Sequence, residues 1–385
     1  MESFSDKSIL ILGASELQVP AIVAAKKRGL ETYVVDFDEN ATGIPFADHF
    51  YNISTLDYEK ILSLAKEKKI NGIMTICSDR PMMVIARVAK ELGLHAISPE
   101  SAYLATNKAA MRKALREENV PVPGFEIVND FHTFLLSAEH FPNSFIVKPS
   151  DNSGSRGITL VNRYDEWEPA YNYASENSSD GVVLIEEYMD GPEVSVEIMV
   201  SHGKVQVIQI TDKITTGAPH FVEMGHTQPS RLSENIKNQI KKISIDAVKA
   251  LKITTGPAHV EVKVTKEGVK IVELGARLGG DYITTDLVEL STGYDMVDAA
   301  VLCSLGNEVT AEFLESRHSA IRYFSFNQYV NLTRNIISKM ERMYINKLDV
   351  SEVKSSRDRE AFFIVSADTE KELDKKIYEI EEGIL

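Results

Sequence analysis

Positive charge is scarce in this chain. Its 385 residues include 42 lysines and arginines against 57 aspartates and glutamates, which gives a formal net charge of -15. Proteins that bind nucleic acids neutralise phosphates with a basic surface, and anionic membranes attract basic segments. The charge balance therefore argues against both kinds of partner.

Cysteine, tryptophan and long apolar runs are also rare or absent. Cys77 and Cys303 lie in apolar surroundings without metal-ligand spacing, so they predict buried thiols in a reducing compartment. The single tryptophan, Trp167, falls in a helical pattern and predicts packing. No apolar run approaches the ~20 residues that span a bilayer, and MESFSDKSIL at the start does not resemble a signal peptide. We expect a cytoplasmic protein.

The first hundred residues predict an α/β domain. At 43% hydrophobic and 26% charged, the chain is ordinary globular sequence, long enough for two or three domains. In residues 7–98 the runs SILIL, TYVVD, GIMTIC and HAIS alternate with helical patterns, which predicts a parallel sheet covered on both faces. No G-x-G-x-x-G follows Gly13, so a scaffold lining a small-molecule site is favoured over dinucleotide binding.

The remaining sequence predicts an α+β architecture. The helical pattern ATNKAAMRKALREEN ends at VPVPG, residues 120–124, and strands and helices then mix from about 125 to 200. Residues 204–274 are mostly strand around one long helix, which indicates an antiparallel sheet. The last stretch ends in the strand AFFIVSA and a charged helix; this pattern indicates structural closure and says little about chemistry.

A lysine and a glycine-bearing loop, KPSDNSGSRG at residues 148–157, follow the apolar run FIV. Loops of this composition are often plain surface. This one also suits a phosphate, because Lys148 supplies a fixed cation and the loop supplies backbone N–H groups without bulk.

Two glutamates are predicted to face each other across a hairpin in HVEVKVTKEGVKIVELGARLGGD, residues 259–281. A loop at Lys266–Gly268 places Glu261 opposite Glu273 on one face of the hairpin. On the mostly apolar face the same register gives the pairs Val260–Leu274, Val262–Val272 and Val264–Lys270. Opposed like charges destabilise a sheet, and Mg²⁺ bound between the carboxylates would remove the repulsion. The alternatives are a slipped register or two glutamates that point into water.

In this order the motifs resemble those of the ATP-grasp carboxylate–amine ligases, over roughly residues 7–305. The resemblance implies that two lysines reach the ATP phosphates and that a small-residue loop covers them. The matching residues are Lys108, Lys148, Ser153, Gly154, Ser155 and Gly157. It also implies a multidomain fold: a Rossmann-like domain over residues 1–100, then two α+β subdomains that grip the nucleotide, over 101–200 and 201–310, and a closing segment over 311–385.

The segment LIEEYMDGPEVSVEIMV resembles the adenine hinge and ribose clamp of this family. By that match Glu186, Glu187 and Met189 border the adenine and Glu193 accepts the ribose hydroxyls, although an edge strand with solvent-facing acids has the same pattern. Glu261 and Glu273 match the positions that hold Mg²⁺ or Mn²⁺.

The sequence after the second glutamate implies the reacting end of the site. Arg277 matches the arginine that stabilises the acyl phosphate, beside the backbone of Gly279 and Gly280. One position departs from the family pattern, because Gly275 stands where many members have asparagine. One metal ligand is therefore in doubt, and water or a different carboxylate would have to replace it.

The Glu273–Arg277 spacing and the motif EMGHTQPS resemble the branch that includes bacterial L-amino-acid ligases and biotin-carboxylase-like proteins. By analogy Glu223 and His226 face the substrate, although a histidine in a loop is more often on the surface. A further group follows a strand of the parallel sheet, where such sheets bind ligands. It comprises Ser78, Asp79 and Arg80.

The resemblance implies an ATP-dependent ligase that forms a C–N bond between two small molecules and releases ADP and phosphate. The acid is expected to be an amino acid or a related carboxylate, and the protein a homodimer. Two alternatives stay open. One is activation of a one-carbon acid, as in biotin carboxylase or purine-pathway enzymes, and the other is a non-catalytic nucleotide-binding module.

Overall fold

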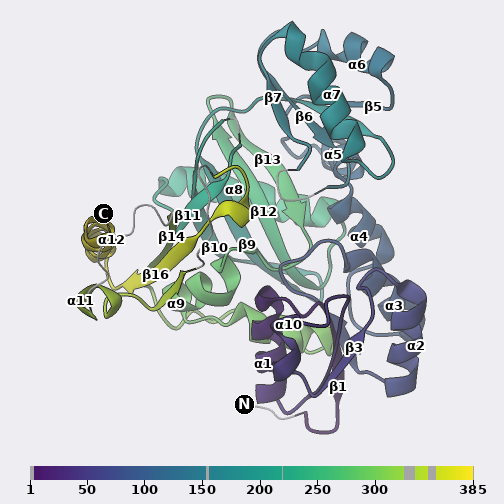
Figure 1. Ribbon diagram of the computed structural model, residues 1–385, viewed down its shortest axis with the longest axis vertical. Coiled ribbons are helices and arrows are strands. Elements are labelled where there is room, and N and C mark those ends of the chain that lie inside the picture. The colour runs from purple at the N-terminus through teal and green to yellow at the C-terminus, as the bar shows by residue number, and fades with distance from the viewer. Residues whose placement is uncertain (1–3, 153–155, 219, 325–333, 346–352, 385) are drawn as a thin grey trace.

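The computed structural model describes residues 4–152, 156–218, 220–324, 334–345 and 353–384. Within these ranges the strands form three sheets (Figure 1). The N-terminal domain lies at the bottom of the view, a small lobe at the top, and the largest sheet between them. No helix in the described part of the chain is long and apolar enough to span a membrane.

The N-terminal sheet is parallel, with strand order β3-β2-β1-β4, which confirms the predicted architecture of this domain. Its strands are β1 Ser8–Leu12, β2 Glu31–Asp36, β3 His49–Asn52 and β4 Gly72–Met74. Its helices are α1 Val19–Lys27, α2 Tyr58–Lys68 and α3 Met82–Leu92. All five residues of β1 are buried, because helices cover both faces of the sheet.

Two predictions about local elements in this half were wrong. HAIS, residues 95–98, forms no strand, because α3 stops at the left-handed Gly93 and Ser98 already caps α4, Pro99–Thr106. The single helix expected around residues 105–119 is divided at Asn107, whose backbone is extended and whose side chain accepts from the Ala110 N–H. Lys108 is therefore the first residue of α5, Lys108–Glu117.

The small lobe is an antiparallel sheet with the order β5-β8-β6-β7. Its elements are β5 Phe125–Val128, α6 Phe131–Ala138, β6 Phe145–Pro149, β7 Thr159–Val161, α7 Trp167–Glu176 and β8 Val183–Glu187. Trp167 lies edge-on to Phe134 and Phe145 in the core of this lobe, which confirms its predicted packing role.

The large sheet has eight strands in the order β13-β12-β9-β10-β11-β14-β16-β15. They are β9 Glu193–Ser201, β10 Lys204–Thr215, β11 Glu223–Gln228, β12 Gly256–Thr265, β13 Gly268–Gly275, β14 His318–Phe324, β15 Arg342–Ile345 and β16 Ala361–Ala367. The associated helices are α8 Glu234–Ala250, α9 Val288–Thr292, α10 Met296–Ser304, α11 Arg334–Ile337 and α12 Glu370–Ile384. The helix α8 buries its apolar stripe against one face of β9, β12 and β13, and the opposite face of these strands carries mostly polar side chains.

The hairpin of β12 and β13 keeps the two predicted pairs nearest its open end, Glu261–Glu273 and Val260–Leu274. Beyond them a bulge shifts the register, so the predicted partners Val272 and Lys270 were wrong: Val262 pairs with Ile271, and Val264 with Val269. The extra residue lets Ile271 turn into the core, where it is fully buried, and shortens the turn to two residues.

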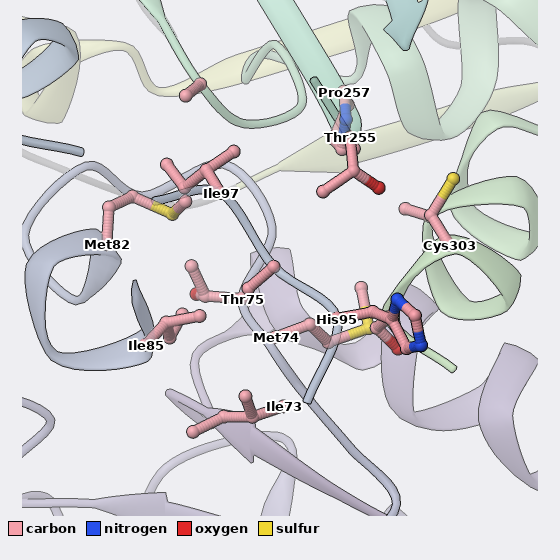
Figure 2. A pocket seen from close by; sticks show the side chains of 15 residues that line it. Ile73, Met74, Thr75, Met82, Ile85, His95, Ile97, Thr255, Pro257 and Cys303 are labelled. Atoms are coloured by element: carbon pink, nitrogen blue, oxygen red, sulfur yellow. The ribbon is translucent and has the colours of Figure 1, made fainter. Parts of the chain in front are cut away.

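An apolar cavity of about 60 Å³ lies where the N-terminal domain meets the large sheet and α10 (Figure 2). Met82 and Ile97 line it from the N-terminal half, and Thr255 and Cys303 from the other side. Its lining also includes Thr75 and Ala276. The segments that follow β4 and β13 therefore approach each other here.

Candidate active site

The candidate active site lies on the polar face of the large sheet. Because side chains alternate along strands, neighbouring strands bring polar residues together in rows. On β9 and β12 the cross-strand pairs are Glu193–Lys263, Ser195–Glu261 and Glu197–His259. Glu273 on β13 and Lys213 on β10 extend these rows on either side.

Each of the two opposed glutamates has a lysine partner. The Nζ atom of Lys108 lies 2.8 Å from Glu273 Oε1, and the Nζ atom of Lys213 lies 3.0 Å from Glu261 Oε1. Burial by itself would raise the pKa of Glu261, but Lys213 and His259 hold it well below its ordinary value. Glu261 is therefore ionised, as a metal ligand must be.

Lys213 is a central residue that the sequence reading missed. Its ammonium also lies 2.9 Å from Glu193 and 2.6 Å from Glu223, so three carboxylates share one buried lysine. Burial opposes the charge of this group, yet its carboxylate neighbours raise its pKa well above the usual value. The only signal in the sequence was a lysine inside a long strand pattern, which more often faces water.

The cluster carries one more carboxylate than it has lysines. The acidic members are Glu193, Glu223, Glu261 and Glu273, and the basic members are Lys108, Lys213 and Lys263. A surplus of hard oxygen donors fits Mg²⁺ or Mn²⁺. The two glutamates opposed across the hairpin, Glu261 and Glu273, are the residues that would hold such an ion.

A second buried cluster joins α5 to the small lobe. The Nζ atom of Lys148 lies 2.7 Å from Glu186 Oε2, and Arg112 donates to both oxygens of that carboxylate, at 2.7 and 3.1 Å. Burial would raise the pKa of Glu186, but the two cations lower it to about 2. Burial lowers the pKa of Lys148. Two cations around one carboxylate make this a place for an anion.

Arg112 is a second residue that the sequence reading missed. Its side chain is fully buried, and Nη2 also donates to the Val272 carbonyl at 2.6 Å. It therefore ties the strand of Glu186 to the strand of Glu273. Its four-residue spacing from Lys108 on one helix was the available signal, since such residues share a face.

The residues predicted around the adenine and ribose follow from β8 into β9. Glu187 contacts Lys270 and the Gly124 N–H, both at 3.1 Å, and Met189 lies two residues beyond it. Glu193 is held by two lysines. The nucleotide contacts of these residues stay a prediction, as does that of Glu186, whose carboxylate oxygens already accept from Arg112 and Lys148.

Part of the predicted phosphate loop lies outside the described residues, namely Ser153, Gly154 and Ser155. Lys108 contacts the start of this loop, where its Nζ donates to the Asn152 carbonyl at 2.7 Å. At the far end, Gly157 has φ of +78°, and a Cβ there would lie 2.9 Å from Asn177 Cβ. Only glycine suits this position.

Arg277 meets Asp79 of the N-terminal domain in a two-point ion pair. Nε lies 3.0 Å from Asp79 Oδ1, and Nη2 lies 3.0 Å from Oδ2. Ser78 beside it is half-buried and Arg80 is exposed. The structure thus brings Asp79 and Arg277 together, although the sequence reading placed them in separate motifs.

The glycine pair after Arg277 packs tightly on one side only. A Cβ at Gly279 would lie 2.6 Å from His259 Nδ1, whereas Gly280 faces open space. Burial would lower the pKa of His259, but Glu197 at 2.9 Å raises it to about 9. Gly279 therefore rests directly on a buried charged pair.

The alternative interpretation of His226, as a residue of a surface loop, was wrong, whereas its predicted contact with a substrate stays a prediction. His226 lies in β11, fully buried, with Nε2 3.4 Å from Asp281 Oδ2. Asp281 and the next residue, Tyr282, both have positive φ, of 52° and 60°, which is strained backbone of the kind found at functional sites.

The C-terminal segment also contributes to this corner, although no motif in its sequence indicated this. Arg359 donates to both oxygens of Asp281, at 2.5 and 2.7 Å, and to the Glu223 carbonyl at 3.1 Å. The segment reaches the site because β14, β16 and β15 continue the large sheet. Ligand atoms of Glu223, His226 and Asp281 lie within 4.8 Å of one another, but both carboxylates already hold cationic side chains. This corner suits a polar substrate better than a metal ion.

Comparison with known proteins agrees with this arrangement. Residues 141–286 match the family model described as ATP-grasp domain. The chain is 27% identical to the uncharacterized protein y4rH of Sinorhizobium fredii over 263 residues. This aligned region makes up 67% of this chain and 54% of that protein. The chain thus spans about half the length of this relative.

Several solved structures match over nearly the whole chain. The L-amino acid ligase of Bacillus licheniformis has a TM-score of 0.81 at 20% identity, over 98% of this chain and 97% of that one. A second structure is the biotin carboxylase domain of the Hydrogenobacter thermophilus 2-oxoglutarate carboxylase, in complex with MgADP and bicarbonate. It has a TM-score of 0.77 at 18% identity, over 97% of this chain and 89% of that one. The predicted fold class and family resemblance are confirmed: residues 141–286 match the ATP-grasp domain, and the chain as a whole has the ATP-grasp fold.

Proposed function

We propose that this protein is an ATP-dependent carboxylate–amine ligase that activates a small carboxylic acid as an acyl phosphate and couples it to an amine. The observation that carries the proposal is the polar face of the large sheet. There Glu261 and Glu273 stand opposite each other beside Lys108. A nucleotide-binding module would need the lysines, but it would have little use for the carboxylate pair.

Nucleotide binding is assigned to both buried clusters. Lys148 carries its charge beside a second cation, Arg112, and this surplus would be balanced by phosphate oxygens. Lys108 would reach the same phosphates from the start of α5. Mg²⁺ or Mn²⁺ held by Glu261 and Glu273 would neutralise the charge of the phosphates.

The proposed reaction has two steps. A carboxylate oxygen of the acid attacks the γ-phosphorus of ATP; an O–P bond forms, the bond to the bridging oxygen breaks, and ADP leaves. The amine nitrogen then attacks the acyl carbon, phosphate departs, and a phosphate oxygen or an acidic side chain takes the amine proton. Arg277 and the backbone of Gly280 would hold the acyl phosphate and the oxyanion, so that positioning and electrostatics supply the rate.

An amino acid is the substrate that we favour. Glu223, His226 and Asp281 form a polar corner on the same face as the metal ligands. Among the described residues, His226 Nδ1 is buried without a hydrogen-bond partner, which leaves a polar contact for a ligand to make. An amino acid, which has several hydrogen-bonding groups, suits this polar corner better than bicarbonate does.

Hydroxylamine trapping tests the proposal without knowledge of the amine. The protein is incubated with ATP, Mg²⁺, hydroxylamine and pools of amino acids or other small acids, and hydroxamates are detected by mass. We expect ATP-dependent hydroxamates, which Glu273→Gln abolishes. Arg277→Ala should lower kcat while ADP affinity persists, and the exposed Glu91→Gln should change neither quantity.

Two results would contradict the proposal. ATP turnover stimulated by bicarbonate, with no hydroxamate from any pool, would favour the one-carbon alternative. Tight ADP binding without turnover under any condition would favour a non-catalytic module.

A further inference from the structure

Position 275, at the end of β13, has no room for a side chain unless the ion pair of Asp79 and Arg277 moves. A Cβ on Gly275 would lie 2.9 Å from Asp79 Oδ1 and 3.1 Å from both Cζ and Nε of Arg277. Gly275 is not among the residues with positive φ, so its backbone would accept other amino acids. Glycine therefore suits this position for a steric reason: the ion pair of Asp79 and Arg277 occupies the space that a side chain at position 275 would need.

Asp79 is held in this place by the N-terminal domain. The Gln18 side chain accepts from the Ile76 N–H at 3.0 Å and donates to the Ile76 carbonyl. Cys77, in left-handed backbone, donates from Sγ to the Gly279 carbonyl at 3.2 Å. The Asp79 carbonyl accepts from the N–H of Met82, the first residue of α3. These bonds fix the loop from both sides.

The pair also determines which way the Arg277 guanidinium faces. Nε and Nη2 donate to Asp79, and Nη1 donates to the Leu278 carbonyl at 3.2 Å. A guanidinium has five N–H donors, so two, on Nη1 and Nη2, have no acceptor among the described residues. These two can grip one anionic group from the side away from Asp79.

We propose that Asp79 is a positioning residue that aims Arg277 at the acyl phosphate, and that Gly275 is glycine so that Asp79 can reach it. The role of Asp79 in aiming Arg277 rests on the proposed function, whereas the packing of Asp79 against Gly275 does not. It makes the N-terminal domain part of the ligase site, since a carboxylate 198 residues away orients the arginine. Loss of Asp79 should misdirect Arg277 and leave nucleotide binding intact.

A double-mutant cycle on urea unfolding tests the packing without any substrate. Gly275→Ala should lower the urea midpoint in the wild-type background, because the new Cβ meets Asp79 and Arg277. In an Asp79→Ala background the same substitution should lower it by clearly less. Equal losses in the two backgrounds would overturn the claim that Gly275 makes room for Asp79.

Kinetics test the positioning role. Asp79→Asn should lower kcat for hydroxamate formation about 10- to 100-fold, as loss of an orienting partner does, with KM for ATP and ADP affinity within about twofold of wild type. The matched control is Asp298→Asn, because Asp298 pairs with Arg28 and its side chain is 20% exposed, as that of Asp79 is.

The kinetic outcomes separate the two proposals. Equal activity of the two asparagine variants, or a parallel loss of ADP affinity in Asp79→Asn, would overturn the positioning role. If the wild type itself forms no hydroxamate, the proposed function fails, whereas the unfolding cycle still decides the packing of Asp79 against Gly275.

Discussion

Removing the Arg112 guanidinium should destabilise the small lobe strongly. The side chain is 1% exposed and makes three hydrogen bonds, two to Glu186 and one to the Val272 carbonyl. Arg112→Met keeps the length and apolar stem of the side chain but leaves a buried carboxylate with Lys148 alone. Breaking a buried ion pair from one side costs about 3–5 kcal/mol, and an orphaned carbonyl adds about 1–3 kcal/mol. Since Lys148 still compensates Glu186, we expect a loss of about 4 kcal/mol.

The single tryptophan makes this loss measurable. Trp167 packs in the same lobe that contains Glu186, so its fluorescence during urea unfolding reports on this lobe. With a slope of about 2 kcal/mol per molar urea, the midpoint should fall by about 2 M. The control is Lys113→Met, which removes an exposed charge from the same helix. A loss below about 1 kcal/mol for Arg112→Met would refute the reasoning, because such values are typical of exposed pairs.

Three further predictions concern acidity, backbone and metal. The pKa of Glu186 falls from 4.5 to about 2 on folding, so its stabilising contribution is present above pH 4.5 and is lost as the pH falls towards 2. The unfolding free energies of wild type and Glu186→Gln should therefore converge between pH 4.5 and 2, and a difference that does not change with pH would contradict this. Gly191→Ala places a Cβ against the Val264 carbonyl oxygen at φ of +132°, so urea unfolding should show a loss of about 3 kcal/mol or more, against about 1–2 kcal/mol for Gly203→Ala, where φ is +79° and no atom lies within 4 Å of the new Cβ. Glu273→Gln should weaken Mn²⁺ binding, followed by the paramagnetic resonance of the free ion, by about tenfold or more, and unchanged binding would remove Glu273 from the metal site.

Short-range patterns were sufficient for much of the fold. Apolar runs separated by helical periods predicted the parallel N-terminal sheet, and one turn signal predicted that Glu261 faces Glu273. Both depend on contacts between residues near in sequence, where strand alternation and turn geometry decide the outcome. The two other pairs predicted for the hairpin, nearer its turn, were wrong, because the prediction assumed regular pairing and a bulge at Val272 shifts the register.

The composition of the site was decided by tertiary structure. Arg112 reaches Glu186 across 74 residues, Arg359 reaches Asp281 across 78, and Asp79 reaches Arg277 across 198. The sequence by itself determined which segments become strands and helices, and which of them carry lysines, glutamates and glycines in a recognisable order. It could not determine which charges become partners, because a buried ion pair depends on how separate elements pack and exclude water, and residue spacing along the chain does not record that.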